Sequence, residues 1–209
     1  MIDNALTLLR DELEAYINPD KTATPVVVIG NIAHWESESN ENLKESLVMT
    51  LVNVEEESTL KNRSNQRRHP NGTVSYEQPP IFINLFLLIS ANFAGSREGY
   101  LKALRLLSRV LQFFQNKQVF TLSNSPHTTL GQAEGDELAA LQDMKLYIEF
   151  YTLNFEQLNH LWGSLGGKQM PFAMYKIRLV KLQERKAIEA PLIETIEIII
   201  HKMADKPLT

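Results

Sequence analysis

The chain has 209 residues, of which 44% are hydrophobic and 22% charged. This near-average composition excludes a wholly disordered, collagen-like or coiled-coil protein, and the length suffices for one folded domain without a metal or a disulfide. The formal net charge of -4 gives no electrostatic case for binding nucleic acid, and the absence of cysteine excludes a disulfide scaffold, a thiol nucleophile and cysteine-ligated zinc.

The first predicted element is a helix at the N-terminus. Apolar residues recur at steps of three and four from Ile2 to Ile17, which places them on one stripe, and Pro19 ends the helix. The β-branched segment 25–30 then predicts a short buried strand. In residues 46–57 apolar side chains alternate onto both faces, which predicts a central strand or one covered by a partner.

Residues 58–80 form the clearest predicted loop, because they are polar and rich in turn-forming residues. A loop of this length in a compact domain is usually functional or disordered. The alternative is a long hairpin that Pro70, Asn71 and Gly72 close, with the preceding strand extending into it.

The second half of the chain alternates between strand and helix patterns. Residues 97–116 carry the strongest helix pattern, with an apolar stripe formed by Leu101, Leu104, Leu107, Leu111 and Phe114. The other predictions are strands at 81–90, 119–121, 145–154, 174–181 and near 196–200, a loop at about 123–143, and a short helix at 155–165. This order predicts an α/β (mixed α+β) fold, a single domain over 1–209 with one mixed sheet and helices packed on its face.

No catalytic or metal-binding constellation stands out, so we expect neither an enzyme nor a cofactor. The glycine-rich segment 163–168 is one residue short of a phosphate-binding loop, and we interpret it as a turn that ends a helix. The five histidines are scattered, and none has a partner at metal-ligand spacing. The most apolar stretch, 81–89, is far shorter than the ~20 residues that span a bilayer.

Two charged clusters lie close together in the sequence. Glu55, Glu56 and Glu57 form either a solvated strand end or an acidic docking patch for a neighbouring subunit. In the predicted loop, Arg63, Arg67 and Arg68 form either a solubilising tip or an arm that meets the acidic strand end of the next subunit.

Four segments together resemble one family. The chain is similar to the cap, or tail-terminator, proteins of extracellular contractile injection systems, which are phage-tail-like particles related to antifeeding prophages and virulence-cassette particles. The resemblance spans nearly the whole chain, and its most specific part joins a strand end, a helix, a Gly-Gly turn and a strand. It rests on residues 51–57, 79–90, 100–118 and 154–180.

The resemblance implies a non-enzymatic subunit of a six-fold ring that ends the inner tube and secures the contractile sheath. The implied partners are copies of the chain, the inner-tube protein and the sheath protein, with assembly in the bacterial cytoplasm before incorporation into the particle. The strand carrying Ile196, Ile198 and Ile200 would pair with extended arms of the sheath. The alternatives are a baseplate or sheath-adaptor subunit of such a particle and, in another class, a small-molecule-binding enzyme.

Overall fold

The chain divides into two compact units, which we describe separately. The larger unit comprises Met1–Lys61 and Pro80–Leu182, and the smaller comprises Asn62–Pro79 and Gln183–Thr209. The structure, a computed structural model, describes residues 1–20, 26–35, 43–57, 66–68, 74–77, 81–93, 97–132, 135–182 and 187–190.

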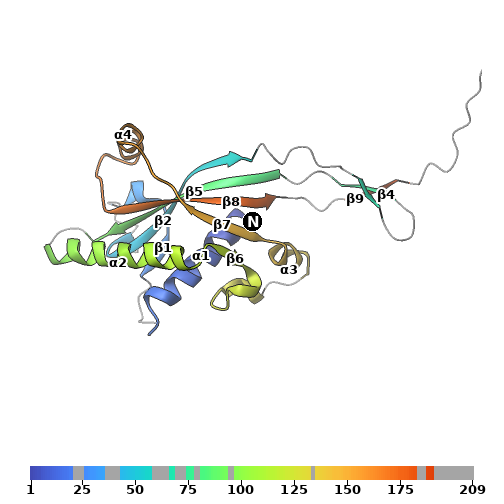
Figure 1. Ribbon diagram of the computed structural model, residues 1–209, viewed down its shortest axis with the longest axis horizontal. Helices are drawn as coiled ribbons and strands as arrows, with labels where there is room; N and C mark the ends of the chain where they lie inside the picture. Colours follow the sequence, from blue (N-terminus) through green and yellow to red (C-terminus); the bar gives the residue numbers. More distant parts are fainter. Residues whose placement is uncertain are drawn as a thin grey trace, which may run out of the picture. The chain divides into compact units, whose positions relative to one another are not determined.

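A six-stranded sheet forms the centre of the larger unit (Figure 1). β1 runs parallel to β2, and the other neighbouring strands are antiparallel, so the sheet is mixed. The prediction of a mixed α+β fold with one mixed sheet and packed helices is therefore confirmed. In spatial order the strands are β1 (Val27–Ile29), β2 (Ser46–Glu56), β5 (Ile81–Asn92), β8 (Phe172–Leu182), β7 (Lys145–Phe150) and β6 (Val119–Thr121).

Both faces of this sheet are covered. Along β2, Leu47 and Met49 point into the main hydrophobic core, whereas Val48 points into a smaller cluster on the opposite face. This alternation is what the sequence of β2 predicts for a central strand, and β2 lies between β1 and β5. β5 is likewise buried on both faces, with Leu87 in the main core and Leu88 in the smaller cluster.

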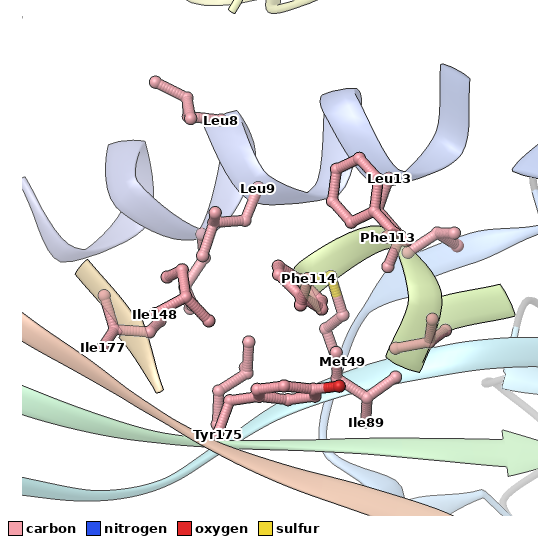
Figure 2. Close-up of a cluster of buried hydrophobic side chains, with 14 of the residues drawn as sticks. Leu8, Leu9, Leu13, Met49, Ile89, Phe113, Phe114, Ile148, Tyr175 and Ile177 are labelled. Carbon is pink, nitrogen blue, oxygen red and sulfur yellow. The ribbon is translucent and has the colours of Figure 1, made fainter. Parts of the chain in front are cut away.

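Helices supply the cover on each face. α1 (Ile2–Ile17) and α2 (Arg97–Asn116) pack against the main core, where their side chains meet those of β2, β5, β7 and β8 (Figure 2). The opposite face is covered by the 3₁₀-helix η1 (Ile32–His34) and by α4 (Phe155–Ser164). Because α2 and α4 lie on different faces of the sheet, their exposed sides form separate surfaces.

The buried face of α2 differs from the predicted stripe. The side chains that α2 buries are Ala103, Val110, Phe113 and Phe114, of which only Phe114 belongs to the predicted set. Leu107 packs partly against the core, but Leu101, Leu104 and Leu111 are exposed. Apolar residues surround more of this helix than one stripe, and the sheet covers only part of them.

The predicted loop at 123–143 contains regular structure. It includes the 3₁₀-helices η4 (Leu122–Asn124) and η5 (Thr129–Gln132) and the short helix α3 (Gly135–Gln142), which is held to the core by the fully buried Leu141. Two carboxylates of α1 anchor this segment. Asp11 accepts hydrogen bonds from the Thr129 N–H at 2.7 Å and its hydroxyl at 2.8 Å, and Glu12 accepts one from the His127 N–H at 2.8 Å.

The smaller unit holds a three-stranded antiparallel sheet in the order β3 (Gln66–Arg68), β4 (Val74–Glu77) and β9 (Ala187–Ala190). β3 and β4 pair within the predicted loop at 58–80, which agrees with the hairpin alternative. Residues 69–73, which would form its turn, lie outside the described residues. The strand predicted at 196–200 also lies outside them, and β9 was not predicted.

Candidate interaction surfaces

The solvent-exposed part of α2 includes four large apolar side chains. Tyr100 is 55% exposed, Leu101 45%, and Leu104 and Leu111 each 39%. Their spacing by four and seven residues places Tyr100, Leu104 and Leu111 along one side of the helix. Exposed apolar side chains that lie along one side of a helix are candidates for contact with another protein.

A hollow of about 420 Å³ lies between the C-terminal half of α2 and strands β7 and β8. Three aromatic rings form much of its wall. The centre of the Tyr175 ring lies 4.6 Å from the centre of the Phe114 ring and 5.6 Å from that of the Phe150 ring. Phe150 is 59% exposed, so it also forms part of the rim. The full lining is Leu111, Phe114, Gln115, Gln118, Ile148, Phe150 and Tyr175.

The polar groups of this hollow suit binding rather than catalysis. Among its lining residues, Tyr175 alone carries a titratable group. Burial raises the pKa of the Tyr175 hydroxyl, so the group stays neutral at physiological pH. The remaining polar side chains are the amides of Gln115 and Gln118, which donate and accept hydrogen bonds. The hollow therefore fits an apolar group with polar neighbours.

A second hollow, of about 400 Å³, lies beside the N-terminal half of α2. Leu104 and Leu107 of the helix line it, so the exposed side of α2 borders a hollow at each of its two ends. The other lining residues are Tyr100, Gln169, Met170, Pro171 and Phe172.

On the opposite face of the sheet, α4 presents an aromatic side chain to solvent. Phe155, the first residue of α4, is 86% exposed. A capping box holds this end of the helix: the Gln157 N–H donates to Asn154 Oδ1 at 2.8 Å, and the Asn154 N–H donates to Gln157 Oε1 at 3.0 Å. The other end is anchored by Trp162, which is buried against Phe172.

The glycine-rich segment after α4 ends the helix, as the sequence predicts. Gly166 and Gly167 have φ values of +101° and +78°, and the Gly167 N–H donates to the Trp162 carbonyl at 2.7 Å. Left-handed backbone of this kind favours glycine at helix ends.

The three acidic residues predicted as a docking patch differ in their exposure to solvent. Glu55 and Glu56 are exposed near the end of β2. Glu57 is largely covered: it accepts a hydrogen bond from Asn84 Nδ2 at 3.0 Å and lies 3.9 Å from Arg178. Glu57 is thus partly covered by its own chain, whereas the side chains of Glu55 and Glu56 are exposed to solvent.

The predicted basic and apolar contact residues are not placed by the described structure. Arg67 and Arg68 lie on β3, whose side chains are not described, and Arg63 lies outside the described residues. Ile196, Ile198 and Ile200 also lie outside them. The basic arm and the sheath-pairing strand therefore stay predictions.

The described part of the chain holds neither a metal-binding cluster nor a membrane-spanning helix. Within it, no group of three or more His, Asp or Glu side chains is arranged to hold a metal ion. Across those same residues, no helix combines the length and apolarity needed to cross a membrane.

Comparisons with known proteins identify the fold and the family. The structure resembles the sheath/tube terminator of an extracellular contractile injection system, PVC, in its extended state, with a TM-score of 0.61 and 15% identity, over 98% of this chain and 64% of that chain. It also resembles the tube-terminating cap of the anti-feeding prophage, with a TM-score of 0.60 and 14% identity, over 96% of this chain and 61% of that chain. The chain thus spans less than two thirds of the length of either structure.

Both matched proteins are structural terminators, not enzymes. A search of curated protein sequences gives no match. The family profile described as the Pvc16 N-terminal domain matches residues 5–195, which is nearly the whole chain. The resemblance inferred from the sequence is confirmed, and the chain belongs to the Pvc16 N-terminal domain family.

Proposed function

We propose that this protein is the structural subunit of a homo-oligomeric ring, of six copies, that caps the distal end of the inner tube and sheath of a contractile injection system. The observation that carries the proposal is the terminator fold, which extends over 98% of the chain. The exposed apolar side chains Tyr100, Leu104 and Leu111 of α2 support it, because exposed apolar patches mark sites of contact with other proteins. Assembly would take place in the bacterial cytoplasm, before the subunit becomes part of the particle.

The physical task of such a ring follows from the way tubes grow. Identical subunits that add head to tail make an open contact, which has no intrinsic end. A terminator matches the growing face on one side and presents a different face outward. In the same position it would hold the last layer of sheath, and so end assembly of both polymers.

Deleting the gene should leave polymerisation intact but remove its stop signal. Electron micrographs of the deletion strain are expected to show particles of irregular length, or tubes that have lost their sheath. The matched control is the same strain complemented with the wild-type gene, which should restore uniform length. Intact, sheathed particles of uniform length in the deletion strain would contradict the cap function. Particles with a defective baseplate would instead support the adaptor alternative.

The charged clusters supply a second, independent contact in this proposal. We infer that the arm carrying Arg63, Arg67 and Arg68 meets the acidic end of β2 on the next subunit, where Glu55 and Glu56 are exposed. Opposite charges on two patches steer subunits into one orientation.

Replacing the three arginines with Ser should weaken ring formation and leave folding unchanged. The difference from wild type is expected to be largest at low salt, since the Debye length falls from ~30 Å at 0.01 M to ~10 Å at 0.1 M ionic strength. Sedimentation at several salt concentrations measures it, and circular dichroism checks the fold. If the variant assembles as well as the wild type at every ionic strength, the arm is a solubilising loop.

A further inference from the structure

The exposed side chain of Phe155, which we call the knob, and the hollow lined by Phe150 and Tyr175 lie on opposite faces of the six-stranded sheet. The hollow is on the face covered by α2, since Phe114 and Tyr175 belong to the main core. α4 is on the other face, since Leu161 packs against the cluster of Val48 and Leu88. Phe155, at the start of α4, therefore has the six-stranded sheet between itself and the hollow of its own chain.

Phe155 is an exposed aromatic side chain at the start of a helix whose first turn is fixed by hydrogen bonds. Its ring is 86% exposed, and the helix turn that carries it is secured by the two hydrogen bonds between Asn154 and Gln157. A side chain on such a preorganised element loses little conformational entropy on binding. Aromatic residues that present a large apolar area in this way are typical anchors of protein interfaces.

We propose that Phe155 of one subunit inserts into the hollow between α2 and β7 of the next subunit. This inference rests on the proposed ring and identifies one of its contacts. Knob and hollow are different patches, so the contact is head to tail, the kind that closes into a ring when the rotation allows. A second copy is the occupant we commit to, because the same chain carries both matching parts.

The chemistry of the two patches is complementary. Phe150, which is 59% exposed, offers its ring to an entering phenyl group for edge-to-face packing, and the nearly buried Phe114 and Tyr175 form the adjoining wall of the hollow. The volume of about 420 Å³ lies within the ~300–1,000 Å³ typical of ligand pockets, so the hollow has room for an aromatic side chain. Glu156 follows Phe155 and is exposed, so its carboxylate can accept a hydrogen bond from an amide on the rim, Gln115 or Gln118.

The contact extends beyond the single ring. A stable interface buries ~800 Å² on each partner, whereas one aromatic side chain buries ~150–250 Å². Leu111 belongs to the hollow, and Leu104 continues the exposed side of α2 away from it. Phe155 thus acts as the anchor, and the apolar side of α2 supplies part of the remaining area.

The absence of cysteine in the chain permits a direct test of the geometry. Single variants Glu156→Cys and Gln115→Cys leave Phe155 and the aromatic residues of the hollow in place, and they put one thiol beside the knob and one at the rim of the hollow. With a short bismaleimide cross-linker, a mixture of the two variants should give covalent dimers, whereas neither variant alone should. The double variant should give a ladder that ends at the ring size, which native mass spectrometry of the wild-type protein measures independently.

A second experiment tests the energetics. Phe155→Ala is expected to weaken association at least ~30-fold, the factor that corresponds to a hot-spot residue. Ile29→Ala, at an exposed apolar position on the edge strand β1, is the control and should leave association unchanged. Leu111→Arg should block the hollow, and it should weaken association by a factor similar to that of Phe155→Ala, which removes the knob. Mixing these two defective variants should give one-to-one dimers that do not grow, because each retains one intact patch.

The outcomes separate this inference from the proposed function. If the wild type forms rings and Phe155→Ala does so equally well, the knob contact is wrong and the ring stands. Cross-linking of Glu156→Cys to itself would show a symmetric contact and overturn the inference, as would cross-linking only to tube or sheath protein. A wild type that stays monomeric with tube and sheath protein present would contradict the ring itself. Circular dichroism of each variant excludes loss of folding as the cause.

Discussion

Replacing Phe114 with Ala is expected to lower the free energy of unfolding by about 3–5 kcal/mol. The Phe114 side chain is 3% exposed, and its ring packs 4.6 Å from Tyr175, 5.0 Å from Phe113 and 6.0 Å from Phe120. Truncation to Ala removes these contacts and leaves a cavity that the neighbouring α2 and β8 cannot close without moving. Urea unfolding followed by circular dichroism measures the loss.

Leu101→Ala is the matched control on the same helix. Leu101 belongs to the same predicted stripe as Phe114, but it is 45% exposed. Its truncation should therefore change the free energy of unfolding of the isolated subunit by no more than about 0.5 kcal/mol, as is usual for surface positions. Equal losses at the two positions would show that the stripe predicted from the sequence, and not the observed face, packs against the sheet.

Replacing Lys117 with Met is expected to cost about 3–5 kcal/mol, because it leaves the carboxylate of Glu12 buried without its counter-ion. Lys117 Nζ lies 3.0 Å from Glu12 Oε2, donates to the Asn124 carbonyl at 2.6 Å and sits 4.6 Å from the centre of the Phe120 ring. The Glu12 side chain is only 6% exposed, so its carboxylate is poorly hydrated once the ammonium group is removed. Urea unfolding again gives the magnitude.

A double variant and an exposed pair serve as controls for Lys117. Adding Glu12→Gln to Lys117→Met should recover part of the stability, because the buried charge is removed with its partner. Breaking the exposed pair of Arg178 and Glu149, 3.0 Å apart, by Glu149→Gln should cost about 1 kcal/mol or less. If Lys117→Met costs no more than Glu149→Gln, the pair of Glu12 and Lys117 is solvated in solution and does not anchor the loop.

The family could be predicted from the sequence, whereas the contact surfaces could not. The resemblance over residues 51–57, 79–90, 100–118 and 154–180 pointed to terminator proteins, whose fold the structure shares, and the chain belongs to the Pvc16 N-terminal domain family. Phe155 was missed as a site residue, because its spacing from Leu158 and Trp162 puts it on a stripe that looks buried. Trp162 is 4% exposed and Phe155 86%, a difference that depends on which end of α4 lies against the sheet.

Local sequence determined the elements whose signals act over a few residues. α1 ends at Ile17 before Pro19, which cannot continue a helix, and α4 ends before the Gly166 and Gly167 turn. The apolar alternation of β2 identified it as a strand covered on both faces. These features follow from backbone geometry and from the periods of 3.6 and 2 residues, which each segment carries in itself.

The tertiary structure decided what each element packs against. α2 has more apolar surface than one sheet face can cover, so the position of the sheet selected Phe113 and left Leu111 in solvent. It also buries Glu12 of α1, whose carboxylate binds the His127 N–H and Lys117. In the same way it places Phe150 beside Tyr175, and both residues line the hollow. Such pairings join residues far apart in the chain, and their free energies depend on the packing of the whole core, which no local period encodes.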